Sequence, residues 1–596
     1  MKTYDERYES IMSKIEILEK VQRRKSVLIV GCQMLLLLAV VLIPMIVLTL
    51  IPYKVELPDV SMYADSPYYS LIQRINEATA PKPKYKNYFE VVLAYFSGKK
   101  STLSNRYSSQ MADPRLEITD NQVEGVIEAD IIKRSDKYIY YLSEYHLYIY
   151  SINGPESKLV RSYSLGDKTE PWYSYDDLEM YLSQDGTTIT LVGTCEVGRE
   201  KKCTRVVNLD VRDPTDVHES GRIYLSGSIL SSRMVDDKLL LMSQFKISSN
   251  KNFSDESTFL PQVGQPGKMV SVAPEDIVVP ERIDDTYYTV VCMLDGKSLS
   301  VYDSAAYLSY SRTVHVSENH IFLMNSYTKE NEADIGRTMT EIACLSYSGE
   351  TFAHKGTVTV EGSVKNQYSM DEHEGILRVV TSVDTVYDSK NQNASLYCVS
   401  LADFRIVASV EKFAPAGEQA TSVRFDGDYA YVCTANIKER IDPVYFFDLS
   451  DLDNITYKDT GTIKGYSSSL VNFGDGYLMG IGYSDTKDLK IEIYEEERDR
   501  VTSVCVYERR ERFSEYYKSY FIDREKHLIG LGVQNKSSGE CHYTLLRFDG
   551  HSLQKVANVP IGDIDCYYAR AVLIDDYLYI FGPNYSWDGF EVVQVG

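Results

Sequence analysis

A pair of strands that recurs about every 50 residues is the feature that most constrains the fold of this chain. From about residue 120 onward, a short polar turn, usually containing Asp or Gly, is followed by an apolar strand and then by a second strand. The position three residues before each turn is occupied in succession by Lys133, Ser183, Arg233, His315, Glu372, Arg424, Asn472, Ile522 and Val572, with spacings of 50, 50, 82, 57, 52, 48, 50 and 50. Strand pairs at this period without intervening helices are typical of β-propeller blades. The sequence therefore predicts an all-β propeller over residues 118–596.

The number of copies sets the number of blades. Nine copies predict nine four-stranded blades if each is complete, but propellers commonly hold four to eight, so eight and nine both stay open. The last copy ends at Gly596 without an outer strand, and we expect the region of Ile118 to supply it and close the ring. The 49 Tyr residues fit this fold because Tyr suits pleated, half-buried strands.

One interval is much longer than the others. The spacing of 82 residues contains an insertion, residues 246–286. The insertion carries four prolines, which are Pro261, Pro266, Pro274 and Pro280. Proline cannot donate to a sheet ladder, so we expect the insertion to leave its blade as a loop. As a long surface loop it is also the expected contact for a partner.

The N-terminal part contains a candidate membrane anchor. Residues 27–51 are 25 consecutive positions without a charge, long enough for a helix that crosses about 30 Å of hydrocarbon. Arg23, Arg24 and Lys25 precede the run, so the positive-inside rule keeps the N-terminus in the cytoplasm. A cleaved signal peptide is the alternative, but its apolar region would be about 7–15 residues long. We therefore expect a single-pass protein of the cell membrane with an extracytoplasmic propeller.

The charge of the chain divides at this anchor. The cytoplasmic tail, residues 1–26, carries +2, whereas the whole chain carries −23 and the exported part therefore −25. An acidic surface repels a phosphate backbone, so nucleic acid is excluded as a partner. The remaining expected partners are the membrane and an unidentified protein or envelope ligand.

A short stalk is expected between the anchor and the propeller, over residues 52–117. Ser66 and Pro67 are typical of a helix start, and apolar residues follow at helical spacing. Asn87 with Glu90 resembles a capping box at the start of a second helix over Asn87–Phe96.

The cysteines offer one candidate disulfide. Cys195 and Cys203 flank a short polar segment and are expected to form a local hairpin bridge. Cys292, Cys344 and Cys398 occupy equivalent places in successive apolar strands, and we interpret them as small buried apolar residues. The spacing of a zinc site is absent, and no metal ligand is predicted.

Several segments carry a family resemblance. These are GVIEADIIKRSDKYIYYLSEYHLYIYSI from Gly125, SSRMVDDKLLL from Ser231, SVRFDGDYAYVCTA from Ser422 and DPVYFFDLSDLDN from Asp442. In them the chain resembles bacterial and archaeal secreted or membrane-anchored proteins with a C-terminal β-propeller domain, distantly similar to WD repeats. The resemblance implies a propeller and no assigned reaction. This chain departs from the family pattern at Ile127, which replaces an acidic residue, and at Leu470-Val471-Asn472, which replaces a Leu-His-Pro segment.

The strand before each turn would carry the candidate site. If it is innermost, its side chains approach the central channel from different blades. The candidates for an axial ligand-binding site are Lys133, Arg233, His315, Glu372, Arg424 and Asn472. Such a site would suit an anionic or hydroxylated ligand. The alternative is that these groups form ion pairs between blades, and it is favoured because buried Arg needs a fixed partner.

The sequence contains none of the usual catalytic signatures. The motifs HExxH, GxSxG, GxxxxGK[ST] and a GxGxxG at a strand-to-helix turn are absent, so no catalytic residue and no cofactor is predicted. The chain is therefore expected to be an extracytoplasmic binding or interaction module rather than an enzyme. The alternative is a hydrolase or metal-dependent enzyme with its site at the mouth of the channel.

Overall fold

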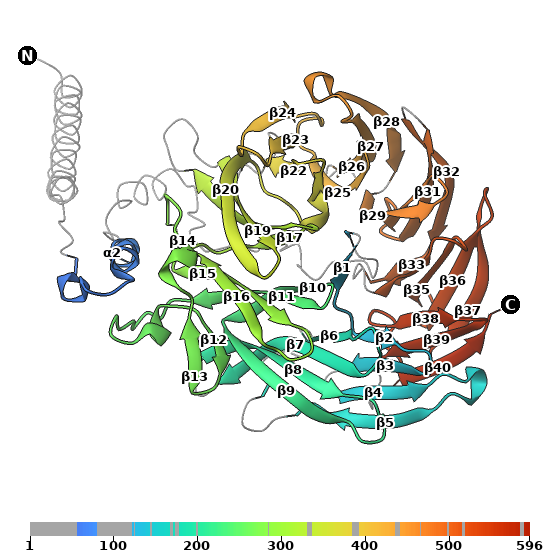
Figure 1. Cartoon of the computed structure of the whole chain (residues 1–596). Helices are drawn as coiled ribbons and strands as arrows, with labels where there is room; N and C mark the ends of the chain where they lie inside the picture. Colours follow the sequence, from blue (N-terminus) through green and yellow to red (C-terminus); the bar gives the residue numbers. More distant parts are fainter. Residues whose placement is uncertain are drawn as a thin grey trace, which may run out of the picture. The chain divides into compact units, whose positions relative to one another are not determined.

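The computed structural model of this chain describes residues 57–79, 122–123, 125–143, 146–166, 171–172, 178–197, 201–283, 285–329, 337–383, 392–435, 441–464, 466–497, 500–514, 519–583 and 589–595. The chain forms two compact units, one of residues 1–64 and 73–108 and the other of residues 65–72 and 109–596. In the second unit the described strands form nine sheets arranged around a common centre (Figure 1). The predicted all-β propeller is confirmed, and it has nine blades. We number them from 1 to 9 in chain order.

Five blades are four-stranded antiparallel sheets with consecutive strand order. Blade 1 consists of β2 (Ile132–Arg134), β3 (Tyr138–Ser143), β4 (His146–Ser151) and β5 (Leu159–Ser164). Blade 4 consists of β17 (Thr313–Val316), β18 (His320–Lys329), β19 (Arg337–Ser348) and β20 (Thr351–Glu361). Blade 5 consists of β21 (Met370–His373), β22 (Ile376–Val383), β23 (Asn393–Ser400) and β24 (Ile406–Val410). Blade 6 consists of β25 (Gln419–Asp426), β26 (Tyr429–Ala435), β27 (Ile441–Asp448) and β28 (Thr456–Lys464). Blade 7 consists of β29 (Tyr466–Gly474), β30 (Tyr477–Tyr483), β31 (Leu489–Glu497) and β32 (Arg500–Arg509).

The other four blades depart from this plan. Blade 2 consists of β6 (Glu179–Leu182), β7 (Thr188–Val197), β8 (Lys201–Asp210) and β9 (His218–Ser226), extended by β12 (Gln262–Gln265) and β13 (Lys268–Ser271). Blade 3 consists of β10 (Ser228–Val235), β11 (Lys238–Lys246), β15 (Tyr287–Asp295) and β16 (Val301–Tyr307), with β1 (Val126–Glu128) and β14 (Ile277–Val278) at its edges. Blade 8 consists of β33 (Glu511–Phe513), β34 (Phe521–Asp523), β35 (Leu528–Asn535), β36 (Cys541–Phe548) and β37 (Leu553–Pro560). The described strands of blade 9 are β38 (Arg570–Ile574), β39 (Tyr577–Gly582) and β40 (Gly589–Gln594).

The recurring polar turns connect the first and second strands of the blades. At two-residue hairpin turns the first residue often has a positive φ, as at Asp236 (53°), Asp475 (49°) and Asp575 (53°). Asp and Gly tolerate this backbone conformation, and turns of this kind match the twist of the flanking strands. The first strand of each pair lies toward the centre of the ring in Figure 1. The expectation that the pre-turn strand is innermost is therefore met, except that β1 lies further inside β10 in blade 3.

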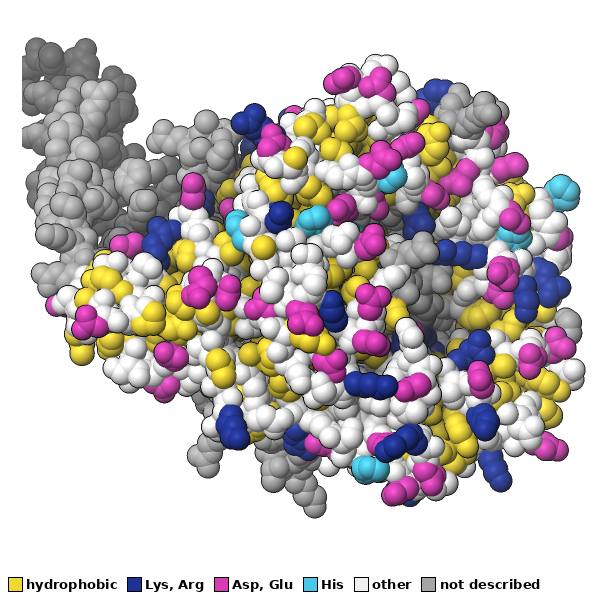
Figure 2. Space-filling view, viewed as in Figure 1, with side chains coloured by type: hydrophobic (Ala, Val, Ile, Leu, Met, Phe, Trp, Pro, Cys, Tyr) yellow, Lys and Arg dark blue, Asp and Glu magenta, His cyan; other side chains and the backbone are white. Residues whose placement is uncertain are grey.

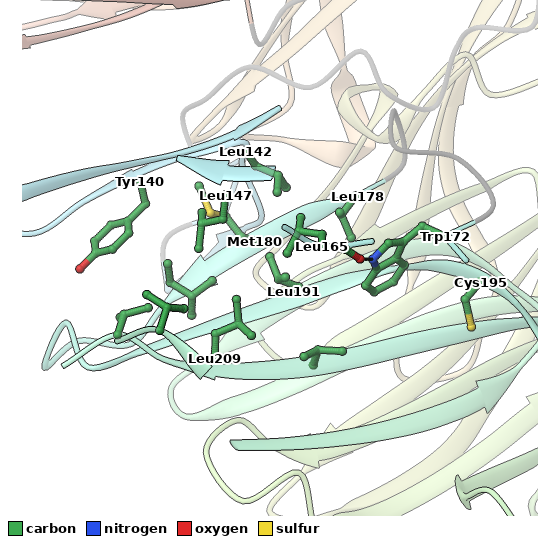
Figure 3. Close-up of a cluster of buried hydrophobic side chains, with 14 of the residues drawn as sticks. Tyr140, Leu142, Leu147, Leu165, Trp172, Leu178, Met180, Leu191, Cys195 and Leu209 are labelled. Carbon is green, nitrogen blue, oxygen red and sulfur yellow. Dashed lines mark hydrogen bonds between the residues drawn. The ribbon is translucent and has the colours of Figure 1, made fainter. Parts of the chain in front are cut away.

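Apolar side chains fill the spaces between neighbouring blades. Figure 3 shows one such cluster, in which side chains from β3 and β4 of blade 1 meet others from β6, β7 and β8 of blade 2. Trp172 lies in this cluster, and its indole nitrogen donates to the carbonyl oxygen of Leu165 at 3.2 Å. Because both faces of a blade are covered by its neighbours, the sequences of the strands are nearly continuous apolar runs. Cys292, Cys344 and Cys398 lie in these strands and are fully buried, as predicted.

An aromatic cluster closes the ring between blades 9 and 1. Tyr141 and Tyr150 of blade 1 pack against Phe581 and Phe590 of blade 9, and the rings of Tyr150 and Phe590 stack with centroids 4.3 Å apart. Ile118, which was expected to supply a strand here, lies outside the described residues. The first described strand after it, β1, instead pairs antiparallel with β10 of blade 3.

The insertion between β11 and β15 is not a simple loop, and that expectation was wrong. It folds back and adds the β12–β13 hairpin to the outer strand β9 of blade 2, and it adds β14 to β16 of blade 3. The four prolines do not prevent this, because they lie outside the added strands. Pro261 precedes β12, Pro266 lies in the hairpin turn, Pro274 begins a 3₁₀ turn and Pro280 follows β14. An outer edge can accept such strands where a central position could not.

The described helical elements are short. The α-helix α2 spans Tyr69–Ala78, and 3₁₀ turns span Ser61–Tyr63, Gly154–Glu156, Glu256–Thr258, Pro274–Asp276, Gln367–Ser369 (η5) and Leu452–Asn454. The hydroxyl of Ser66 accepts a hydrogen bond from the amide of Tyr68 at 3.2 Å, as expected for a helix start. Each helix within the described residues is too short or too polar to cross a bilayer. The predicted anchor at 27–51 and the predicted helix Asn87–Phe96 lie outside those residues.

Candidate functional site

The six predicted site residues lie on the innermost strands of six blades. Lys133 lies on β2, Arg233 on β10, His315 on β17, Glu372 on β21, Arg424 on β25 and Asn472 on β29. Each pairs with the second strand of its own blade, as Arg233 does with Leu240, His315 with Phe322 and Glu372 with Leu377. The repeat therefore places Lys133, Arg233, His315 and Arg424 at equivalent positions around the ring. Glu372 lies one residue closer to its turn, and Asn472 adjoins a β-bulge, so their equivalence predicted from the spacing was wrong. The contacts of all six decide what they can do.

Arg233 is held by an acidic residue and an amide. Its guanidinium lies 3.4 Å from the carboxylate of Glu128 on β1 and donates to the side-chain oxygen of Gln367 at 2.5 Å. The amide nitrogen of Gln367 in turn donates to Glu128 at 3.0 Å. All three side chains are buried. Strand β1, blade 3 and the segment between blades 4 and 5 are thus joined by one charged, hydrogen-bonded cluster, which we call the β1 cluster (Glu128, Arg233, Gln367).

Lys133 belongs to the same region. Its ammonium group donates to the backbone carbonyl of Glu128 at 3.0 Å and lies 6.0 Å from the ring centroid of Tyr181. Gln122 also reaches this region, since its side chain donates to the carbonyl oxygens of Gln367 and Met370, each at 3.0 Å. The segment that precedes blade 1 is therefore held by contacts from three other parts of the ring.

Glu372 joins blade 5 to blade 4. Its carboxylate accepts hydrogen bonds from Nδ1 of His320, at 2.9 Å, and from the hydroxyl of Ser317. Burial opposes ionisation of Glu372, but these two hydrogen bonds prevail and hold its pKa below the ordinary value. This carboxylate is therefore ionised at neutral pH and occupied by its neighbours.

His315 is the most isolated of the six. Its side chain is 1% exposed and stacks on Phe322, with ring centroids 5.9 Å apart. Neither ring nitrogen has a hydrogen-bond partner among the described residues. Burial lowers the pKa of His315 to about 4, so the imidazole is neutral at neutral pH. A neutral, enclosed imidazole of this kind is neither a cationic ligand site nor a paired structural group.

Arg424 and Asn472 lie near a shared carboxylate. The amide nitrogen of Asn472 donates to Asp426 at 3.2 Å, from blade 7 to blade 6. Burial lowers the pKa of Arg424, although the carboxylates of Asp426, Asp371 and Glu496 oppose this effect. Arg524 adds to the effect of burial, so the acidic groups of blades 5, 6 and 7 attract the positive charge of Arg424 without outweighing burial.

The structure divides the six residues between two arrangements. Arg233, His315 and Glu372 are electrostatically coupled across blades 3, 4 and 5, whereas Arg424 and Asn472 share Asp426 across blades 6 and 7. Most of the hydrogen bonds run from one blade to another, whereas the ion pair of Arg233 with Glu128 lies within the sheet of blade 3. Sequence reasoning missed Glu128, although it lies within the segment that carries the family resemblance, GVIEAD.

Most of this architecture matches a known domain family. A family model described as the beta propeller domain matches residues 118–584. The chain belongs to this family.

Two relatives of this beta propeller domain protein are archaeal. A protein of Archaeoglobus fulgidus, described as uncharacterized, is 28% identical over 263 residues, which are 44% of this chain and 38% of the relative. A second uncharacterized protein, from Methanocaldococcus jannaschii, is 28% identical over 227 residues, which are 37% of this chain and 34% of the relative. The matches thus span well under half the length of these relatives.

The chain also matches a solved structure at low sequence identity and with a low TM-score. Dipeptidyl peptidase 4 of Porphyromonas gingivalis is 11% identical over 75% of this chain and 55% of its own, with a TM-score of 0.32. This similarity carries no argument about the activity of the present propeller.

The two cysteines of the predicted disulfide can also be located in the propeller. Cys195 and Cys203 lie directly opposite each other on β7 and β8, and both are buried. Both are thiols in this structure, and their bridge stays a prediction. Within the described ranges, no group of three or more His, Cys, Asp or Glu side chains is arranged to hold a metal ion.

Proposed function

We propose that this chain is a membrane-anchored binding protein of the cell envelope, with an extracytoplasmic propeller that contacts a protein or another envelope ligand. The anchor is the uncharged run at 27–51, which follows three consecutive basic residues. The net charge of −25 beyond the anchor keeps the propeller away from an anionic bilayer surface. Figure 2 shows basic and acidic side chains interspersed over the described part of one face, as expected for a soluble surface.

Residues 65–72 belong to the same compact unit as the propeller and contact the insertion. The hydroxyl of Tyr68 donates to the backbone carbonyl of Val272 at 2.9 Å, in a buried position. Val272 directly follows β13 and is itself fully buried. The insertion therefore contacts residues 65–72, in addition to extending blades 2 and 3.

The observation that carries the binding proposal is the open edge of the same insertion. Within the described residues, β13 is the last strand of the blade 2 sheet and pairs with β12 alone. Its residue Val270 is 66% exposed, the largest exposure of any described Val. An unpaired edge strand with an exposed β-branched residue can accept a strand of a partner protein. We infer that β13 is the contact surface for the ligand.

A single substitution on this edge tests the binding proposal. Val270→Lys places a charge on β13, which opposes pairing with another strand. Val506→Lys is the matched control, because Val506 lies on the outer strand β32 of blade 7 and is 50% exposed. Crosslinking in intact membranes should give an adduct with the wild type and with Val506→Lys that is lost with Val270→Lys. Retention of the adduct by Val270→Lys would show that β13 is not the contact surface.

The location of the propeller is tested separately. A protease added to intact cells or spheroplasts should digest the propeller of the full chain and leave a tag at the N-terminus protected. A propeller that is degraded only after lysis would contradict the extracytoplasmic location. This experiment does not depend on the ligand, so the two parts of the proposal can fail independently.

A further inference from the structure

Two cysteines of neighbouring blades lie with their sulfur atoms in contact. Cys541 is the first residue of β36 in blade 8, and Cys566 lies in the segment between β37 and β38 that leads into blade 9. Their Sγ atoms are 2.9 Å apart. Both are thiols in this structure, and neither belongs to the axial groups or to the insertion described above.

The position of Cys566 is fixed by its surroundings. The side chain is 1% exposed and belongs to an apolar cluster formed by blades 8 and 9. Its backbone lies directly on β35, where a Cβ atom at position 532 would be 2.0 Å from the carbonyl oxygen of Cys566. Gly532 is therefore required for this close approach. The amide of Ile561 also donates to the carbonyl of Cys541 at 3.3 Å, which ties the start of the segment to β36.

The two thiols differ in access. Cys541 is half-buried and Cys566 is buried, and burial raises the pKa of the Cys566 thiol. An external reagent can therefore reach Cys541 first, and Cys566 is in place to react with it next. We propose that Cys541 and Cys566 form a disulfide bond that links blade 8 to the entry of blade 9.

The oxidant that this reaction requires is another disulfide, either of a thiol-oxidising protein or of a small thiol such as glutathione. The thiolate of Cys541 attacks one sulfur of this disulfide and releases the first external thiol, leaving a mixed disulfide on Cys541. The thiolate of Cys566 then attacks the sulfur of Cys541 and releases the second external thiol. The two cysteines lose two electrons and two protons, and the external disulfide gains them. Such oxidants act outside the cytoplasm, but the proposal itself does not rest on the proposed binding function.

The bond would stabilise the last step of ring assembly. Cys541 and Cys566 are 25 residues apart, so the link would restrict the unfolded chain around β37. Blade 9 contacts blade 1 through side chains, and three of its strands are described. A covalent link to blade 8 would therefore hold blade 9 against the rest of the ring.

Peptide mapping of the purified full chain tests the proposal. Trypsin releases Cys541 in residues 537–547, Cys566 in residues 556–570 and Cys505 in residues 501–509, each as the single cysteine of its peptide. After incubation with glutathione disulfide and alkylation under denaturing conditions, we expect peptides 537–547 and 556–570 to be linked and peptide 501–509 to be alkylated. Reduction before alkylation should release the linked pair. Recovery of both as alkylated or glutathione-modified single peptides would overturn the proposal.

The melting temperature shows whether an effect of oxidation on stability depends on Cys541. The melting temperature of the wild type should rise on oxidation, and that of Cys541→Ser should not respond to glutathione disulfide. Cys505→Ser is the matched control, since Cys505 is half-buried on β32 of blade 7, and it should respond like the wild type. An equal response of Cys541→Ser and the wild type would also contradict the proposal, even if Cys566 variants fail to fold.

Discussion

Arg570 and Asp130 are joined by two hydrogen bonds across the point where the ring of blades closes. Nη2 of Arg570, on the innermost strand of blade 9, donates to both carboxylate oxygens of Asp130 at 2.9 Å. Asp130 lies between β1 and β2, and its backbone pairs with Met180 of blade 2. The two residues are 440 positions apart in the sequence. One ion pair therefore connects the last blade to the first two.

Removal of this ion pair should weaken ring closure. Arg570→Gln leaves the carboxylate of Asp130 without its cation in a largely buried place, and breaking a buried pair from one side costs about 3 kcal/mol or more. The free energy of unfolding from denaturant titration should fall by that order. Arg212→Gln is the control, because Arg212 pairs with Asp210 on the exposed surface, and it should have little effect. Equal stability of Arg570→Gln and the wild type would contradict this role.

His315 should make the stability of the protein depend on pH. Its pKa is 6.5 in an unfolded chain and about 4 in the folded protein, because burial disfavours the imidazolium. Between these values the unfolded chain binds a proton that the folded chain does not, so stability is fully present above pH 6.5 and is lost as the pH falls through about 4. The loss should reach about 3 kcal/mol.

The variant His315→Phe tests this assignment. An apolar ring removes the buried nitrogens that have no hydrogen-bond partner among the described residues, so the variant should be at least as stable as the wild type at neutral pH. Its denaturation midpoint should change less than that of the wild type between pH 6.5 and 4. His218→Phe, at an exposed position, should keep the pH dependence of the wild type. An equal change of the denaturation midpoint with pH in His315→Phe and the wild type would show that other groups cause the pH dependence.

The architecture of this chain is predictable from sequence because the repeat is local. Turn residues such as Asp236 and Asp475 recur at a fixed distance from apolar strands, and this alone identifies the blades. The partners of the inner charged residues are not predictable in this way. Gln367, which binds Arg233, lies 134 residues away from it, and no periodic pattern relates them. Glu128 is further hidden because β1 is an extra strand outside the repeat.

Burial of charge inside the blades is the other feature that sequence does not reveal. Lys490 and Glu492 alternate with apolar residues on β31, a pattern that ordinarily places charges in solvent. In the structure the side chains are 2% and 0% exposed and form an ion pair of 2.8 Å. The reason is that the face of β31 that carries Lys490 and Glu492 also packs on a neighbouring blade. Tyr494, on that face, lies in one buried cluster with Tyr431 of blade 6.

For this buried pair we expect a double variant to be more stable than the single variant Lys490→Met. Lys490→Met should lower the free energy of unfolding by about 3–5 kcal/mol, since it leaves the carboxylate of Glu492 buried without a cation. Adding Glu492→Gln should restore most of the loss, because the neutral amide can still accept from the hydroxyl of Ser503, which lies 2.5 Å from the carboxylate of Glu492. Denaturant titration of the wild type, the single variant and the double variant checks this. A double variant that is no more stable than Lys490→Met would show that the loss does not come from the unpaired charge of Glu492.

The β1 cluster should control whether β1 stays in the ring. Arg233→Met removes the cation beside the buried carboxylate of Glu128, at a cost of about 3 kcal/mol. Since β1 is a three-residue edge strand that pairs with β10, local release is the easiest way to return Glu128 to water. Amide hydrogen exchange at residues 126–128 should therefore become about 100-fold faster, while exchange in β26 stays unchanged. Lys238→Met, on the exposed end of β11, is the control and should leave β1 protected. Unchanged exchange in Arg233→Met would mean that the pairing with β10 holds β1 without the ion pair.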